Sequence, residues 1–305
     1  MFVTLVGIHP RTEELVRASR EFERGRLSRE AYENEVRKCI SSVIEEQRRL
    51  GFSQVIDGMV KWEDIFRPFS RVLEGVEAGP LTRFFDNNTF FRRPVIRGKI
   101  EYRGGFPNYL SEGVEKAIVP GPYTFTDLSQ NESYSSKLEL MWDYADALKV
   151  IVKELKQKEI TFIQLNEPSL VYRYKRREAS DDELEVIATC FREISNVMKA
   201  SVHLYFGECS EAAKKLAERG VEPIGVDMIE TEHENLLDVP AKLILGVVDA
   251  RNTYMEEVDR IAELVSEIGN AVGISPNCDL EFLPYEQARR KMQILKRVLE
   301  VVLCS

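Results

Sequence analysis

The chain lacks the features that mark membrane proteins and nucleic-acid-binding proteins. No apolar run in its 305 residues approaches the roughly 20 residues of a membrane-spanning helix. Basic residues are also in the minority, because 42 Lys and Arg stand against 51 Asp and Glu, for a net charge of −9. This balance argues against nucleic acid or an anionic membrane as the main partner. With 44% hydrophobic residues, the chain can still bury a full core.

Cysteine and histidine are scarce as well. The five cysteines are odd in number and form no C-x-x-C pair, and the chain has three histidines. This pattern suits a reducing compartment, so we expect a cytoplasmic protein. The chain also lacks a G-x-S-x-G elbow and a glycine-rich phosphate loop after its first predicted strand. These absences argue against a serine hydrolase and against a dinucleotide-binding fold.

Short apolar segments alternate with longer amphipathic segments along the whole chain. The apolar segments predict eight strands, at Phe2–Val6, Gln54–Asp57, Lys116–Val119, Thr161–Leu165, Ser201–Phe206, Pro223–Met228, Lys242–Val248 and Ala271–Ser275. The amphipathic segments predict helices at Glu30–Leu50, Ser135–Lys156, Asp181–Lys199, Ser210–Arg219, Met255–Ile268 and Tyr285–Val302. Eight such repeats in this length predict an α/β fold, a closed (β/α)8 TIM-type barrel over residues 1–305 as a single domain. An open doubly wound sheet is the alternative.

The length left over lies mostly between the second and third predicted strands, at about residues 75–115. Within it, Val95, Ile96, Ile100 and Tyr102 alternate with polar residues. This alternation predicts a β-hairpin insertion.

Polar residues directly follow the predicted strands. The strand Thr161–Leu165, for example, leads into Asn166, Glu167 and Pro168. A helix-capping asparagine is the simpler explanation for one such strand end, but in a barrel all eight ends meet at one mouth, which predicts a small-molecule site. The candidate ligand-binding residues in these loops are Lys61, Trp62, Asp64, Tyr123, Asn166, Glu167, Tyr205, Arg251 and Asn252. No catalytic residue is assigned.

Metal binding is a separate question. Zinc accepts mixed Cys, His and Glu ligands, so Glu230 and Cys278, with Cys209 or His233, form a candidate set. Their spacing gives little support, because no His-x-Cys pair places two ligands on one strand end. We therefore favour no metal site and keep zinc as an alternative.

The strand-end motifs, taken in order, resemble the cobalamin-independent methionine synthase family. Thr4-Leu-Val-Gly7-Ile-His-Pro10-Arg11 is similar to the family's opening strand and loop, and Gly121-Pro122-Tyr-Thr is similar to its "GPxT" loop. Gln164-Leu-Asn166-Glu167-Pro168 resembles its "Q-I-D-E-P" strand end, and Ile274-Ser-Pro-Asn-Cys278 resembles its final cysteine loop. The resemblance covers nearly the whole chain. Family members carry two homologous barrel halves in tandem, the second of which binds the zinc that activates homocysteine.

The resemblance is to the amino-terminal half. The segment from Leu81 to Pro94, with Asp86 and Asn88, resembles the motif T-K-W-F-D-T-N-Y-H-Y-x-x-P of that half, which adds both residues to the ligand-binding candidates. In the catalytic half, a His-x-Cys zinc pair would fall near Tyr205-Phe-Gly207, so two zinc ligands are missing here. Three residues that hold homocysteine in the catalytic half are replaced here by Ile8, Met59 and Asn166.

The resemblance therefore implies a stand-alone amino-terminal-half protein. Its expected activity is methyl transfer from a methyltetrahydrofolate-type donor to homocysteine, together with a separately encoded zinc-bearing half. One alternative is an independent zinc-dependent methyltransferase that acts on a thiol or a corrinoid protein. The other is a non-catalytic scaffold derived from the barrel.

Overall fold

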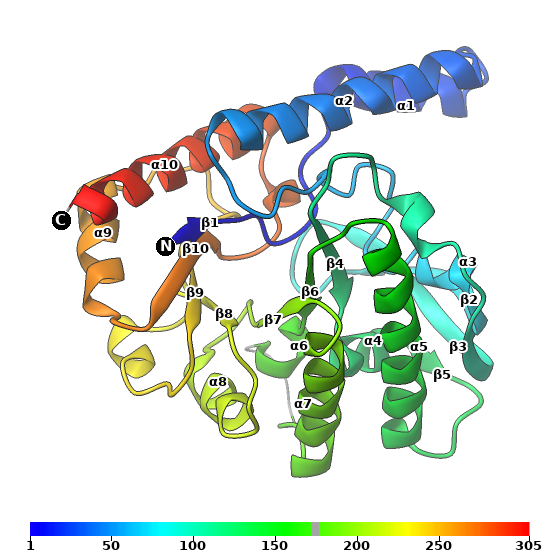
Figure 1. The fold of residues 1–305 in the computed structure, drawn as a ribbon. Helices are drawn as coiled ribbons and strands as arrows, with labels where there is room; N and C mark the ends of the chain where they lie inside the picture. Colours follow the sequence, from blue (N-terminus) through cyan, green and yellow to red (C-terminus); the bar gives the residue numbers. More distant parts are fainter. Residues whose placement is uncertain (173–176, 305) are drawn as a thin grey trace.

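The computed structural model describes residues 1–172 and 177–304 and has a curled parallel sheet at its centre (Figure 1). Within these residues the sheet has seven strands in the order β1-β10-β9-β8-β7-β6-β4. They are β1 (Phe2–Val3), β4 (Lys116–Pro120), β6 (Phe162–Asn166), β7 (Lys199–His203), β8 (Ile224–Asp227), β9 (Leu243–Val248) and β10 (Ala271–Pro276). Every neighbouring pair is parallel, so the carboxyl ends of the strands share one edge.

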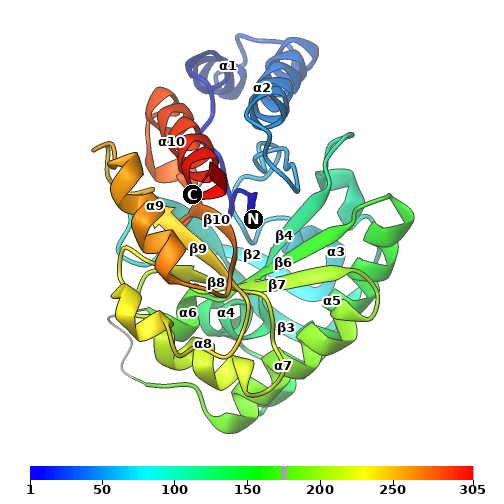
Figure 2. The same ribbon diagram turned by 60° about the vertical axis from the view of Figure 1, so that its left-hand side comes forward.

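Helices connect the strands. The longer ones are α1 (Glu13–Glu23), α2 (Arg29–Arg49), α5 (Lys137–Gln157), α7 (Asp181–Ser195), α8 (Ser210–Ala217), α9 (Val258–Glu267) and α10 (Tyr285–Cys304). Short turns of helix are α3 (Phe69–Val72), α4 (Pro122–Leu128), α6 (Pro168–Val171), η1 (Phe106–Tyr109), η2 (His233–Leu236) and η3 (Leu280–Phe282). Serine side chains cap α2, α5 and α7, which explains where these helices begin. Helices α1 and α2 project from one side of the sheet (Figure 2).

The predicted helices and seven of the eight predicted strands are present, with shifted ends. The prediction of a strand at Gln54–Asp57 is wrong. The side-chain amide of Gln47 on α2 donates to the carbonyl of Ile56 (2.7 Å) and accepts from its N–H (3.1 Å). Because a side chain occupies these backbone groups, the segment cannot form a regular ladder with its neighbours. Helix α1 was not predicted.

The α/β fold with a parallel sheet is confirmed, but the sheet does not close into eight strands. In place of the missing strand, the segment 53–57 passes between β1 and β4. The N–H of Ser53 donates to the carbonyl of Val3 (2.9 Å), and the N–H of Glu115 donates to the carbonyl of Val55 (2.8 Å). The described sheet is therefore a curled, open barrel-like sheet.

The predicted β-hairpin is present as a second sheet. Strands β2 (Leu73–Arg83) and β3 (Phe90–Tyr102) are antiparallel, and β5 (Gln130–Asn131) pairs parallel with β3. The hairpin turn, residues 84–89, contributes Phe84 to the aromatic cover described below. The single-domain boundary at 1–305 stays a prediction.

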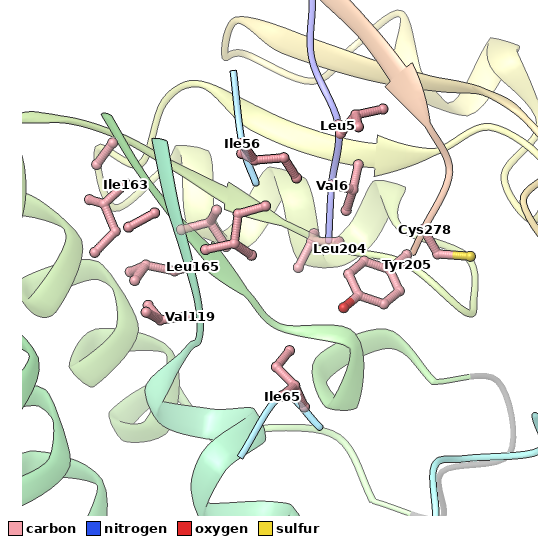
Figure 3. Packing of buried hydrophobic residues seen from close by; sticks show 14 of the residues in the cluster. Leu5, Val6, Ile56, Ile65, Val119, Ile163, Leu165, Leu204, Tyr205 and Cys278 are labelled. Atoms are coloured by element: carbon pink, nitrogen blue, oxygen red, sulfur yellow. The ribbon is translucent and has the colours of Figure 1, made fainter. Parts of the chain in front are cut away.

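Apolar side chains fill the space that the curled sheet encloses. Leu5, Ile56, Val119, Leu165 and Leu204 are almost fully buried there (Figure 3). Among residues 1–172 and 177–304, every helix is too short or too polar to cross a membrane.

One lysine lies within this interior. The ammonium group of Lys116 donates to Thr4 Oγ1 (2.7 Å), the Leu5 carbonyl (2.6 Å) and Gln164 Oε1 (2.8 Å). These bonds connect β4 and β6 to the segment that follows β1. Burial lowers the pKa of Lys116 well below its ordinary value.

Candidate ligand site at the strand ends

The carboxyl ends of the strands bring several predicted residues together in buried positions. Tyr123, Asn166, Glu167 and Tyr205 are each at most 1% exposed. In Figure 3 the hydroxyl of Tyr205 points into the space beyond the strand ends. These residues lie where the sequence placed them, and their contacts determine which of them can meet a ligand.

Glu167 holds the loop that follows β4. Its Oε1 accepts a hydrogen bond from the N–H of Tyr123 (2.9 Å), and its Oε2 accepts one from the N–H of Thr124 (2.6 Å). Gly121 makes this approach possible, because a Cβ at that position would lie 2.3 Å from Oε1. The carboxylate is therefore engaged by the protein backbone.

Asn166 is engaged in the same way. Its side-chain amide donates to the carbonyl of Val6 (3.3 Å), and its Oδ1 accepts from Gln164 Nε2 (2.6 Å). The pair Gln164 and Asn166 thus connects β6 to the segment after β1.

The predicted residues of the second loop contact neighbouring backbone groups, and one of them, Asp64, binds the hairpin. Asp64 accepts from the N–H groups of Phe66 (2.9 Å) and Arg67 (2.8 Å) through Oδ1, and from the N–H of Arg92 (3.0 Å) through Oδ2. The indole of Trp62 is buried and donates to the carbonyl of Tyr109 (3.2 Å). The ammonium of Lys61 lies 3.5 Å from the carbonyl of Leu110.

Three predicted residues lie outside this buried cluster. Asp86 and Asn88 are exposed in the hairpin turn, where Asn88 accepts a hydrogen bond from Arg83 (3.0 Å). Asn252 is exposed and accepts from the N–H of Tyr254 (2.9 Å).

A buried carboxylate organises the loops after β7, β8 and β10. Asp227 accepts from the N–H of Phe206 (3.1 Å), from the N–H of Ile229 (3.0 Å) and from the side-chain amide of Asn277 (3.1 Å). Burial raises the pKa of Asp227 to about 6, although these hydrogen bonds oppose the shift.

Arg251 lies against this network and pairs with Glu230. One guanidinium nitrogen donates to Glu230 Oε1, and the guanidinium carbon lies 5.4 Å from the centre of the Phe206 ring. Cys278 is fully buried, and burial raises the pKa of its thiol well above its ordinary value. The positive charge of Arg251 opposes that rise without overcoming it.

The candidate zinc ligands contact protein groups: Cys209 contacts backbone carbonyls, and His233 contacts glutamate side chains. Cys209 donates to the carbonyls of Gly207 (3.2 Å) and Leu204 (3.4 Å), and His233 lies between Glu234 and Glu267. In the described part of the chain, no three His, Cys, Asp or Glu side chains are grouped so that they could hold a metal. Since Glu230 pairs with Arg251 and no third ligand lies beside Cys278 in the described ranges, these residues are not arranged as a zinc site.

Asp279 and Tyr205 form the polar centre of the mouth. Asp279 Oδ1 accepts a hydrogen bond from the N–H of Ile8 (2.8 Å), and the Tyr205 hydroxyl lies within hydrogen-bonding reach of the Asp279 carboxyl group. Burial raises the pKa of Asp279 to about 6. Burial and then the charge of Asp279 raise the pKa of the half-buried Glu281 to about 8.

Aromatic rings cover this centre. The ring of Phe206 lies 6.0 Å from that of Phe84, 5.2 Å from that of Phe85 and 6.0 Å from that of Phe282. Beneath the hairpin a cavity of about 20 Å³ remains, with Asp279 in its wall.

An open groove of about 950 Å³ adjoins the mouth. It runs between α1, the second loop and the start of α10, and Arg11, Trp62 and Tyr285 line it. Ile8, Glu63 and Glu281 belong to the walls of both the groove and the small cavity.

Asp227, Asp279 and Glu281 were missing from the predicted site. Asp227 ends a strand just as Asn166 does, so the strand-end criterion could have found it. Asp279 directly follows Cys278 in a loop that was recognised. No sequence pattern pointed to Glu281, because its position beside Asp279 depends on the short η3 turn.

The fold and this mouth define the class of protein: an α/β protein whose curled parallel sheet buries polar residues at the carboxyl ends of its strands. The chain belongs to the cobalamin-independent synthase, N-terminal domain family, whose model matches residues 51–273. This membership confirms the resemblance to the amino-terminal half.

Relatives and solved structures agree with this membership. A methionine synthase of Sulfolobus acidocaldarius is 24% identical over 95% of this chain and 88% of its own length. One from Thermococcus kodakarensis is 25% identical over 98% of this chain and 92% of its own length. These relatives are therefore close to this chain in length.

Two solved structures share the fold. A B12-independent methionine synthase from Shewanella sp. W3-18-1, in complex with selenomethionine, has a TM-score of 0.77 at 17% identity, over 99% of this chain and 97% of that one. A methyltransferase from Methanosarcina mazei has a TM-score of 0.59 at 12% identity, over 96% of this chain and 93% of that one. At these identities the likeness concerns the fold alone.

Proposed function

We propose that this chain takes part in methionine formation, as a component of homocysteine methylation that works with a separately encoded zinc-bearing half. The methyl donor would be of the methyltetrahydrofolate type, and the compartment would be the cytoplasm. Membership of the amino-terminal-domain family supports this role. In this proposal, the sheet would close into a barrel if residues 53–57 formed a regular strand between β1 and β4.

One observation carries the proposal: the guanidinium group of Arg251 forms an ion pair with the carboxylate of Glu230. Homocysteine becomes a nucleophile as its thiolate, and a metal commonly supplies the positive charge that lowers the thiol pKa. Here the two residues at zinc-ligand positions of the catalytic half are Glu230, held by the Arg251 guanidinium, and Cys278, whose thiol pKa is raised by burial. This chain alone is therefore poorly equipped to lower the thiol pKa of homocysteine and so to activate it.

The experiment is a reconstitution of homocysteine methylation. The chain, a zinc-bearing catalytic half of the same organism and an equimolar mixture would each be assayed for methionine with methyltetrahydrofolate. We expect no methionine from the chain alone, and a mixture that exceeds the partner alone. Methionine formed by the chain alone, or a mixture no faster than the partner, would overturn the proposal.

The second candidate is an independent methyltransferase that acts on a thiol or a corrinoid protein. Relatives of about this length that carry the name methionine synthase favour it, since this chain spans 88% of the Sulfolobus acidocaldarius protein. Turnover by the chain alone in the same assay would establish this candidate. A non-catalytic scaffold, the third candidate, predicts a stable complex with the partner and an unchanged rate.

A further inference from the structure

Two phenylalanines with left-handed backbones face each other at the strand ends. Phe85 lies in the hairpin turn with a φ of 52°, and Phe206 follows β7 with a φ of 75°. Their ring centres are 5.2 Å apart. A positive φ is uncommon for a bulky side chain and strains the backbone, so it persists only where the surroundings hold it in place. The ring contact therefore joins two strained segments that are far apart in the sequence.

A buried carboxylate fastens each side of this contact. The N–H of Phe206 donates to Asp227 (3.1 Å), which follows from the position of Asp227 at the end of β8. On the hairpin, the N–H of Arg92 donates to Asp64 Oδ2 (3.0 Å) in the second loop. Hydrogen bonds to a charged acceptor are stronger than neutral ones. Both strained segments are thus held down by bonds that can be followed one by one.

The hairpin has a weak point beside its end. The ladder between β2 and β3 shifts its register between Ala78 and Leu81. Such an irregularity disrupts the ladder locally and bends the strand, which suits a hinge. Beyond it lie residues 81–92, here called the hairpin tip. Within the tip the N–H of Phe84 donates to the carbonyl of Thr89 (2.9 Å), so the tip can keep its shape while it moves.

Movement of the hairpin tip would enlarge the small cavity at the strand ends. That cavity measures about 20 Å³, and Phe84 and Phe91 of the tip form its wall together with Asp279. A cavity of roughly 10–15 Å³ is enough for one water molecule, whereas small-molecule sites measure roughly 300–1,000 Å³. Two of its aromatic walls would leave with the tip. The size of the space beside Asp279 therefore depends on where the hairpin tip lies.

We propose that the hairpin tip is a hinged cover over the strand ends, which opens when the rings of Phe85 and Phe206 separate. Opening lets both backbones leave their left-handed conformations, so the strain favours the open state. The ring contact and the two carboxylate hydrogen bonds oppose it, and opposed contributions of this kind give a sparsely populated open state. The inference concerns a motion of this chain and does not rest on the proposed function.

Hydrogen exchange of the full chain, followed by NMR, tests the proposal. The N–H groups of Phe206 and Arg92 report the two sides of the cover, since each donates to a carboxylate. The N–H of Leu204, which donates to the carbonyl of Gly225 (2.9 Å) within the sheet, is the reference. Phe85→Leu removes one ring of the pair, and Phe85→Tyr keeps it. Leu81→Ala, which shortens a side chain of the same tip that is 58% exposed, is the matched control.

In the wild type, the N–H groups of Phe206 and Arg92 should have similar protection factors, both at least about tenfold below that of Leu204. Phe85→Leu should lower both by about three- to tenfold, because an aromatic pair stabilises the closed state by about that factor. Leu204 should keep its protection, and Phe85→Tyr and Leu81→Ala should behave as the wild type.

The coupling between the two sides is the decisive outcome. Phe206→Leu, made on the β7 side, should lower the protection of the Arg92 N–H on the hairpin by the same three- to tenfold. This variant also serves if circular dichroism shows that Phe85→Leu does not fold. Wild-type N–H groups of Phe206 and Arg92 as protected as that of Leu204, or a loss of protection at one of them without the other, would overturn the inference.

Discussion

Replacing Glu167 by glutamine tests whether this residue supports the structure or waits for a ligand. The carboxylate accepts from the N–H groups of Tyr123 (2.9 Å) and Thr124 (2.6 Å). A glutamine oxygen can replace one of these acceptors. Its NH₂ group would then face the other N–H, so a charge-assisted hydrogen bond is lost and a buried donor is left without a partner.

The loss should be large enough to measure. A hydrogen bond to a charged group contributes about 1.5–3 kcal/mol, and an unsatisfied buried donor adds to its loss, so Glu167→Gln should lower the free energy of unfolding by about 2–4 kcal/mol. For a chain of 305 residues the melting temperature should fall by roughly 3–6 °C.

Urea and thermal unfolding, followed by circular dichroism, would measure the change. Glu263→Gln is the matched control, because Glu263 is exposed on α9, and its stability should stay within about 0.5 kcal/mol of the wild type. A Glu167→Gln protein as stable as the control would refute the structural role. If that variant also lost ligand binding, Glu167 would be a ligand-binding residue after all.

Three shorter predictions concern other buried groups. Burial lowers the pKa of His9 from 6.5 to about 4, so the unfolded chain takes up the proton first as the pH falls. Between these pH values the wild type should therefore lose roughly 3 kcal/mol more stability than His9→Gln, and equal slopes in urea unfolding would contradict this. Gly7→Ala should lower the melting temperature because its Cβ would lie 1.8 Å from Asp279 Oδ1, whereas Gly269→Ala, with no atom within 4 Å, should not. Arg251→Gln should cost about 2 kcal/mol of unfolding free energy, because the ion pair between Arg251 and Glu230 is lost, and a stability equal to the wild type would show that the pair is inconsequential.

The regular elements could be predicted because their signals are local. Apolar runs such as Thr161–Leu165 identify strands, and serine caps identify helix starts. The prediction of a second strand was wrong because Gln47, on the preceding helix, forms hydrogen bonds with the backbone of Ile56. Such competition depends on a tertiary contact that periodicity does not report. Helix α1 did carry a signal, a capping Thr12 followed by two glutamates.

The strand-end position of the candidate residues could be predicted from the sequence, but their contacts could not. Parallel strands bring their carboxyl ends to one edge, so Asn166 and Tyr205 were placed correctly. Which polar atoms remain free depends on distances between loops. Glu167 accepts from two backbone N–H groups, whereas Asp279 accepts from the N–H of Ile8 and lies beside the Tyr205 hydroxyl, and both are equally plausible strand-end carboxylates in the sequence.

The zinc content of the purified chain tests the central claim most directly. The account predicts far less than one zinc per chain by elemental analysis, because Arg251 holds Glu230 and no third ligand joins Cys278 within the described residues. About one zinc per chain, lost in Cys278→Ser, would contradict it and make an independent zinc-dependent methyltransferase the better account.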